Sequence, residues 1–228
     1  TPFTCRTFPR FINDFGALRE MGLSFSCPVA AEMMFDPKYD FSFTEEMNDL
    51  PPTLNDIDAR LYFTLLSARK TAYALVQDST KPLARCLAKL LDFAEELQGQ
   101  IGALPTVTEK MDFRSVFQNP ELINPQWPEK VAAGDLTVPV GESHFGRQIA
   151  MYFLFRYFLN LGLEGDVLSA AKMAVVGVLV PTYFGADSWV MHLWSKETEH
   201  SDVNMERYRR LLCTADCLSV PALKSRLV

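Results

Sequence analysis

Two stretches of the chain repeat apolar residues at spacings of three and four, which is the pattern of one helical face. The first predicts a helix over about 55–77, with apolar positions at Ile57, Leu61, Leu65, Ala68, Ala72 and Leu75. The second predicts a helix over about 81–101, with apolar positions at Leu83, Leu87, Leu90, Ala94, Leu97 and Ile101. Asp78, Ser79 and Thr80 between them are residues that cap helices. We therefore expect an antiparallel helical hairpin.

The last third of the chain predicts further helices. Ser143 is expected to cap a helix that ends at Gly162. Its run 152–159 is aromatic or apolar nearly all round, so this helix is predicted to be buried or to form an interface. A second helix is expected over about 165–180, with Pro181 ending or kinking it. Another is expected from Asp187 onward, broken or not, to about 212.

The remaining segments are less regular. Residues 1–27 are predicted to be irregular, and Pro28 suits the first turn of a helix that ends before Pro37. Residues 102–142 are rich in Pro and Gly, which predicts a functional loop, a lid or a disordered insertion, with short helices near 112–118. The sequence thus predicts an all-α fold: an irregular segment over 1–27, then a domain of about seven helices over 28–228.

Composition narrows the class of protein. The 228 residues are 48% hydrophobic and 22% charged, as in globular proteins, and the net charge of −6 disfavours a nucleic-acid partner. The longest apolar run, 173–186, is too short to span a bilayer, so we expect a buried core helix and no membrane partner. Five cysteines in irregular spacing disfavour a disulfide framework, so a cytoplasmic protein is expected.

Cys5 and Cys27 are candidate metal ligands. Zinc and iron–sulfur clusters usually take four ligands, so two thiolates supply half a site. The alternative is a pair of buried, inert thiols, because cysteine is often buried. Cys213 and Cys217 lack the third cysteine of a radical S-adenosylmethionine motif and are interpreted as thiols at the end of a helix.

The run 197–202 is the densest group of reactive side chains. Glu199, His200 and Asp202 are candidate acid–base groups or metal ligands. The alternative is structural, with Ser201 or Asp202 capping the last helix. Arg156, on the aromatic helix, must find a partner there, either a ligand carboxylate or, as we favour, a structural acid.

Four runs of residues together resemble the bacterial flagellin lysine-N-methylase family. The first two are Thr4-Cys5-Arg6-Thr7-Phe8-Pro9-Arg10 and Leu23-Ser24-Phe25-Ser26-Cys27-Pro28-Val29-Ala30-Ala31. The third is the aromatic run 152–158, and the fourth is the polar run 195–204, which contains Glu-His-Ser-Asp-Val-Asn. The resemblance extends from Cys5 to about Leu212 and is weakest in the Pro-rich middle.

The resemblance implies methyl transfer from S-adenosylmethionine to lysine amines of flagellin, together with a cysteine-bound iron–sulfur cluster. Cys5 and Cys27 would then be two ligands of the cluster. The family's upstream cysteines are not in this chain, which begins at Thr1 without Met. We therefore expect the chain to be the C-terminal portion of a longer enzyme and to be inactive alone.

Lysine methylation needs a base, because the free amine is protonated at neutral pH. We expect Glu199 or Asp202 to supply it, with His200 in the same site. The alternative function is a non-enzymatic helical binding or oligomerisation module. A homo-oligomer through the aromatic helix 150–159 belongs to that alternative.

Overall fold

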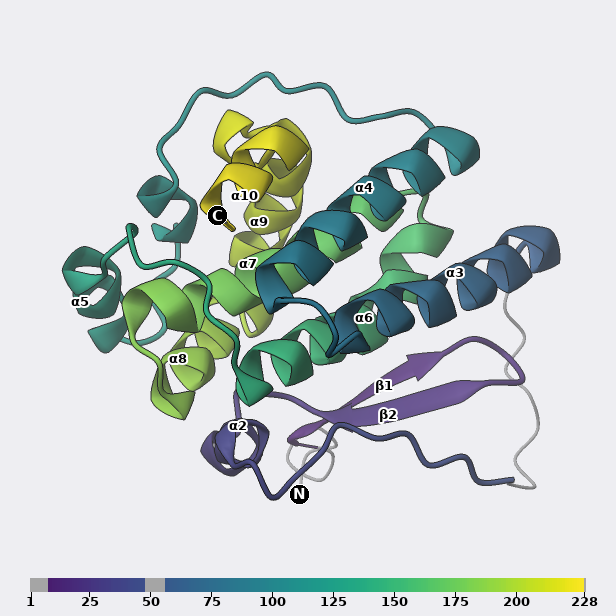
Figure 1. The fold of residues 1–228 in the computed structure, drawn as a ribbon, viewed down its shortest axis with the longest axis horizontal. Helices are drawn as coiled ribbons and strands as arrows, with labels where there is room; N and C mark the ends of the chain where they lie inside the picture. The colour runs from purple at the N-terminus through teal and green to yellow at the C-terminus, as the bar shows by residue number, and fades with distance from the viewer. Residues whose placement is uncertain (1–7, 48–55, 228) are drawn as a thin grey trace.

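The computed structural model describes residues 8–47 and 56–227 and confirms the all-α prediction, with 62% helix and 6% strand. Four long helices form the centre: α3 (Ala59–Gln77), α4 (Leu83–Ile101), α6 (His144–Leu163) and α7 (Val167–Phe184). Each of the four packs against two of the others, in the cyclic order α3, α4, α7, α6 (Figure 1). The predicted hairpin is the pair α3 and α4, which buries most of the apolar positions expected from the spacing. Four of these positions are only half-buried: Ile57, Leu61, Leu75 and Ile101.

The helix α7 is the centre of the core. All of its side chains except Thr182 are buried. Among the described residues it is the one helix long and apolar enough to cross a membrane by length and composition, and 94% of that 18-residue window is buried within the protein. Of the two alternatives predicted for Pro181, ending the helix or kinking it, the first is wrong, because α7 continues to Phe184. Pro181, Tyr183 and Phe184 are all buried, and their packing offsets the roughly 3 kcal/mol that an internal proline costs.

Residues 10–23 form an antiparallel hairpin where the sequence predicted irregular chain. Strand β1 (Arg10–Asp14) pairs with β2 (Arg19–Leu23), and Gly16 takes the positive φ of 82° in the turn. An isolated two-stranded sheet is marginally stable, so its contacts with the helices decide its structure. The buried Glu20 of β2 forms a two-point ion pair with Arg69 of α3.

Shorter helices cover the ends of the four-helix centre. They are α2 (Pro28–Phe35), α5 (Gln126–Ala133), α8 (Ser188–Glu199), α9 (Asp202–Thr214) and α10 (Val220–Arg226), with 3₁₀ turns η1 (Arg114–Phe117) and η2 (Asp216–Leu218). The predicted N-caps Ser143 and Ser201 each accept a backbone N–H, as does Asp187, where a helix was expected to begin. The connector 78–80 does not cap α4, whose N-cap residue is Pro82. The described part of the chain has nine α-helices, and the sequence prediction of about seven missed α5 and α10, which are only eight and seven residues long.

The Pro-rich segment 102–142 belongs to the core rather than to a lid or a disordered insertion. It contains η1 and α5 and buries Phe113, Phe117 and Trp127 almost completely. The indole N–H of Trp127 donates to the carbonyl of Phe117, and both rings contact Phe184 of α7 edge to face. The turn residues set the loops, but the aromatic residues between them hold the segment in place.

Candidate functional site

Glu199, the last residue of α8, is the centre of a buried polar cluster. Its side chain is 4% exposed. One carboxylate oxygen accepts hydrogen bonds from Arg156 (3.1 Å), from Ser24 (3.2 Å) and from Ser195 one turn earlier in α8. The other oxygen accepts from the Tyr157 hydroxyl at 2.6 Å. Four donors from three distant parts of the chain therefore converge on a single carboxylate.

Ser24 brings the segment before Cys27 into this cluster. Its hydroxyl accepts from the Ser26 hydroxyl at 2.9 Å and from the Ser26 backbone N–H at 3.2 Å. Between the two serines, Phe25 is buried and stacks on Tyr152 of α6 with ring centres 3.9 Å apart. The segment that leads to Cys27 is thus fixed by both polar and aromatic contacts.

The partner of Arg156 is the acid Glu199, as the structural interpretation of this arginine predicted. The guanidinium also donates to the Tyr152 hydroxyl and lies over the Phe11 ring of β1 at 4.6 Å. Burial and the adjacent Glu199 carboxylate raise the pKa of Tyr157 well above its ordinary value. Tyr157 therefore stays protonated and serves as a donor to Glu199 over the physiological pH range.

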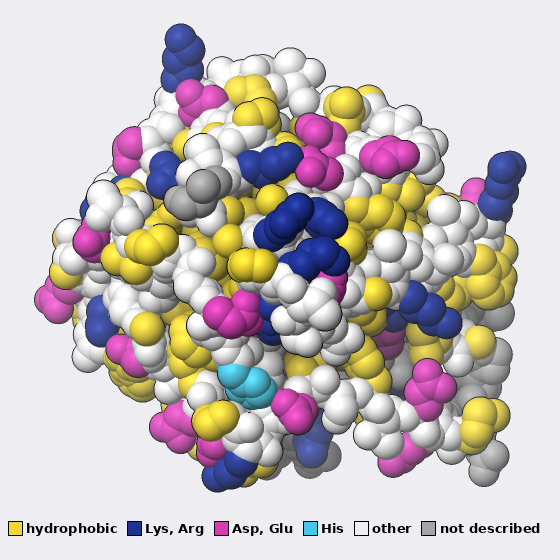
Figure 2. Space-filling model, in the orientation of Figure 1, with side chains coloured by type: hydrophobic (Ala, Val, Ile, Leu, Met, Phe, Trp, Pro, Cys, Tyr) yellow, Lys and Arg dark blue, Asp and Glu magenta, His cyan; other side chains and the backbone are white. Residues whose placement is uncertain are grey.

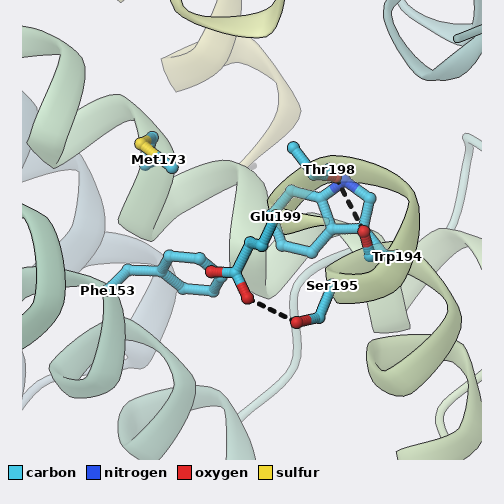
Figure 3. Close-up of a pocket in the computed structure, with 6 residues that line it drawn as sticks. All are labelled: Phe153, Met173, Trp194, Ser195, Thr198 and Glu199. Atoms are coloured by element: carbon cyan, nitrogen blue, oxygen red, sulfur yellow. Dashed lines mark hydrogen bonds between the residues drawn. The ribbon is translucent and has the colours of Figure 1, made fainter. Parts of the chain in front are cut away.

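The cavity beside the Glu199 side chain is very small. Figure 3 shows Ser195 directed at the carboxylate, with Phe153, Met173, Trp194 and Thr198 around it. The cavity they line measures about 10 Å³, which is at most the space one water molecule needs. Sites for drug-sized ligands measure about 300 Å³ or more. A lysine side chain or S-adenosylmethionine does not fit there, so the geometry gives Glu199 a positioning role.

His200 and Asp202 lie at the surface next to the cluster. His200 follows the end of α8, and its exposed ring meets the Phe8 ring edge-on, with centres 6.1 Å apart. Asp202 is exposed in the first turn of α9, directly after the capping residue Ser201. Partial burial lowers the pKa of His200, with Arg156 and Lys196 acting in the same direction and Glu199 against them. The neutral imidazole is the form that can accept a proton.

Cys27 occupies the N-cap position of α2, where its side chain makes no capping hydrogen bond and is half-buried. Cys5 lies outside the described residues. Within residues 8–47 and 56–227, no group of three His, Cys, Asp or Glu side chains is arranged to hold a metal ion. The described residues alone therefore do not form the iron–sulfur site that the resemblance implies. The cavity at Glu199 is too small for S-adenosylmethionine.

Glu197 and Asn204 have a role that the sequence analysis did not assign. Both are fully buried, and they hold the backbone of the Pro-rich segment. One oxygen of Glu197 accepts from the backbone N–H groups of Ile123 and Asn124. Asn204 exchanges two hydrogen bonds with the backbone of Glu121, at 3.0 and 2.7 Å. The only sequence signal for this role was their presence in the polar run 195–204.

Comparison with models of known protein families, with curated proteins and with solved structures finds no match for the chain. A proposal about function therefore depends on the geometry and on the quoted runs of residues.

Proposed function

We propose that the chain is the C-terminal part of an S-adenosylmethionine-dependent protein lysine N-methyltransferase that acts on flagellin. The observation that carries the proposal is the convergence at Glu199. Three of the four runs that resemble the flagellin lysine-N-methylase family supply the cluster: Ser24 from the second, Arg156 and Tyr157 from the third, and Ser195 and Glu199 from the fourth.

The described end of the first run lies at the same place. Phe8 contacts the ring of His200, and the Pro9 carbonyl accepts a hydrogen bond of 2.8 Å from the backbone N–H of Ser24. Ser24 and Glu199, which are 175 positions apart, and Phe8 and His200, which are still farther apart in sequence, thus meet in one region. If the four runs form one site around Glu199, the family would keep their residues together. The resemblance would then be strongest in these runs and weakest in the Pro-rich middle.

Within this proposal the residues have different tasks. Glu199 is a positioning residue that fixes the segment before Cys27 against α6 and α8. His200 and Asp202 are the exposed groups beside it, and the neutral His200 imidazole is suited to take the proton that a lysine amine must lose before methylation. S-adenosylmethionine would supply the methyl group, and the cysteines Cys5 and Cys27 would contribute to the iron–sulfur site of the longer protein.

The test uses the full-length protein that contains this chain, with flagellin and S-adenosylmethionine, and mass spectrometry of the flagellin lysines. We expect His200→Asn to lower the rate at neutral pH about 100-fold, the lower end of the usual range for acid–base groups. The rate of the variant should also lose the pH dependence of the wild type near the histidine pKa. Asp202→Asn tests the other exposed candidate for the base, and Val203→Ala, at an exposed position in the same turn of α9, serves as the matched surface control.

Two results would contradict the proposal in different ways. Wild-type rates and an unchanged pH profile in His200→Asn would remove His200 from the reaction. A full-length protein that binds flagellin but never methylates it would contradict the enzymatic function and favour the helical binding module.

A further inference from the structure

The surface between α3 and α4 contains an open groove that the proposed function does not use. It measures about 650 Å³ and shares no lining residue with the cavity at Glu199. Its lining comes from both helices: Arg60, Phe63, Thr64, Ser67, Ala68 and Thr71 of α3, and Phe93 and Leu97 of α4. In Figure 2 apolar side chains are visible where α3 and α4 lie side by side in Figure 1, and acidic side chains gather over one end of α4.

The exposed face of α3 combines a large aromatic side chain with a row of small residues, which suits it to pack against another helix. Phe63 is 67% exposed and projects from it. Beside Phe63, the small residues Thr64, Ser67 and Thr71 recur at spacings of three and four. Small side chains in such a row allow another helix to approach closely, and a protruding aromatic ring fills a groove on the partner.

The charges on either side of the groove are opposite. Two of the basic residues of α3, Arg60 and Lys70, are exposed, whereas Arg69 is buried against Glu20. The second half of α4 has Asp92, Glu95 and Glu96 and no basic residue, and Asp92 pairs with Lys224 of α10. Lys70 of α3 and Glu96 of α4 are both exposed, and neither takes part in an ion pair within the described ranges. A helix that places exposed basic residues opposite α4 and inserts an aromatic ring therefore complements the acidic α4 side of the groove, and α3 itself has these properties.

We infer that a second copy of this chain docks here, with α3 of each copy lying antiparallel in the α3–α4 groove of the other. Such a two-fold arrangement uses the same surface on both copies, so each Phe63 enters a groove and each Lys70 faces a partner Glu96. Both helices have 19 residues and are each about 28 Å long and 10 Å wide. The two faces together then bury on the order of 1,000 Å², the lower limit for a specific interface.

The first experiment is sedimentation equilibrium of the 228-residue chain over a concentration series. We expect a monomer–dimer equilibrium that Phe63→Glu weakens at least about tenfold. Met21→Glu is the matched control, because Met21 is 61% exposed on the outer face of the hairpin and should leave dimerisation unchanged. Far-UV circular dichroism checks that both variants fold.

The second experiment exchanges the charges. Lys70→Glu and Glu96→Lys should each weaken the dimer several-fold, and the double variant should recover the wild-type dissociation constant, because both ion pairs are then restored in reverse. A chain that stays monomeric throughout, a Phe63→Glu variant that dimerises normally, or a double variant weaker than either single one would overturn the inference. None of these results bears on flagellin methylation.

Discussion

Glu199 illustrates how a reactive side chain in the sequence becomes a structural one in the fold. A buried carboxylate is stable only when hydrogen bonds and a counter-charge replace water. Arg156 supplies the charge, and Ser24, Ser195 and Tyr157 supply the other donors. The cluster is therefore satisfied without a ligand, and its effect is to hold three segments together.

We expect Glu199→Ala to lower the free energy of unfolding by about 3–5 kcal/mol, because the buried Arg156 guanidinium then lacks its partner. Denaturant unfolding followed by circular dichroism measures this loss. Asp202→Ala is the control, since an exposed acid in the first turn of a helix contributes only about 0.3–1 kcal/mol. Equal losses in the two variants would show that the cluster does not stabilise the fold.

Local chemistry at single residues was predictable, and distant partners were not. Ser143 was expected to cap a helix, as was Ser201 or Asp202, and the structure has Ser143 and Ser201 in this role. A cap depends only on residues within one turn. The pairing of Glu199 with Ser24 joins residues 175 positions apart. No spacing rule connects such positions, so only the packed chain brings them together.

At the scale of elements, the close contact of α6 and α7 depends on a glycine. A Cβ atom added at Gly177 of α7 would lie 2.5 Å from the Phe153 ring of α6. In α4, by contrast, a Cβ atom at Gly99 would meet nothing within 4 Å. A substitution at Gly99 therefore tests helix propensity alone, whereas a substitution at Gly177 tests propensity and packing together.

Gly99→Ala should stabilise the chain by about 0.5–1 kcal/mol, because alanine is the better helix former. Gly177→Ala gains the same propensity, but the clash with Phe153 should cost about 1–3 kcal/mol, so we expect no net gain or a net loss. Thermal unfolding of the two variants against the wild type measures both effects. Equal stabilisation would mean that α6 and α7 are not in close contact.

The elements that could not be predicted from the sequence are short ones with little hydrophobic periodicity of their own. The hairpin has five residues in each strand, and α10 has only seven residues. Short elements gain little from propensity and depend on burial against the rest of the chain. The long helices α3 and α4 were predicted well because their apolar periodicity extends over five turns.

At the scale of the whole molecule, one continuous apolar core joins the elements. It extends from Phe15 and Phe25 near the hairpin, through α7, to Leu223 of α10. It also includes Trp127 of the Pro-rich segment. Because no described part has a core of its own, the parts should lose their structure together.

We therefore expect a single cooperative unfolding transition. Tryptophan fluorescence reports on the three tryptophans of α5 and α8, and far-UV circular dichroism reports mainly on the long helices. The two denaturation curves should superimpose. An earlier fluorescence transition would indicate that the Pro-rich segment and α8 separate from the four-helix centre, contrary to the shared core.

The sequence by itself determined the helical class, the long helices, the Ser143 cap of α6 and the core position of α7, because these follow from periodicity and composition over neighbouring residues. Only the tertiary structure decided the hairpin, the packed Pro-rich segment, the passage of α7 through Pro181 and the role of Glu199. In each of these, burial against distant residues outweighs the local preference of the chain. The polar run 195–204 contains both kinds of feature. Its helix cap was predictable from neighbouring residues. The burial of Glu197 and Asn204 and the exposure of His200 and Asp202 were not.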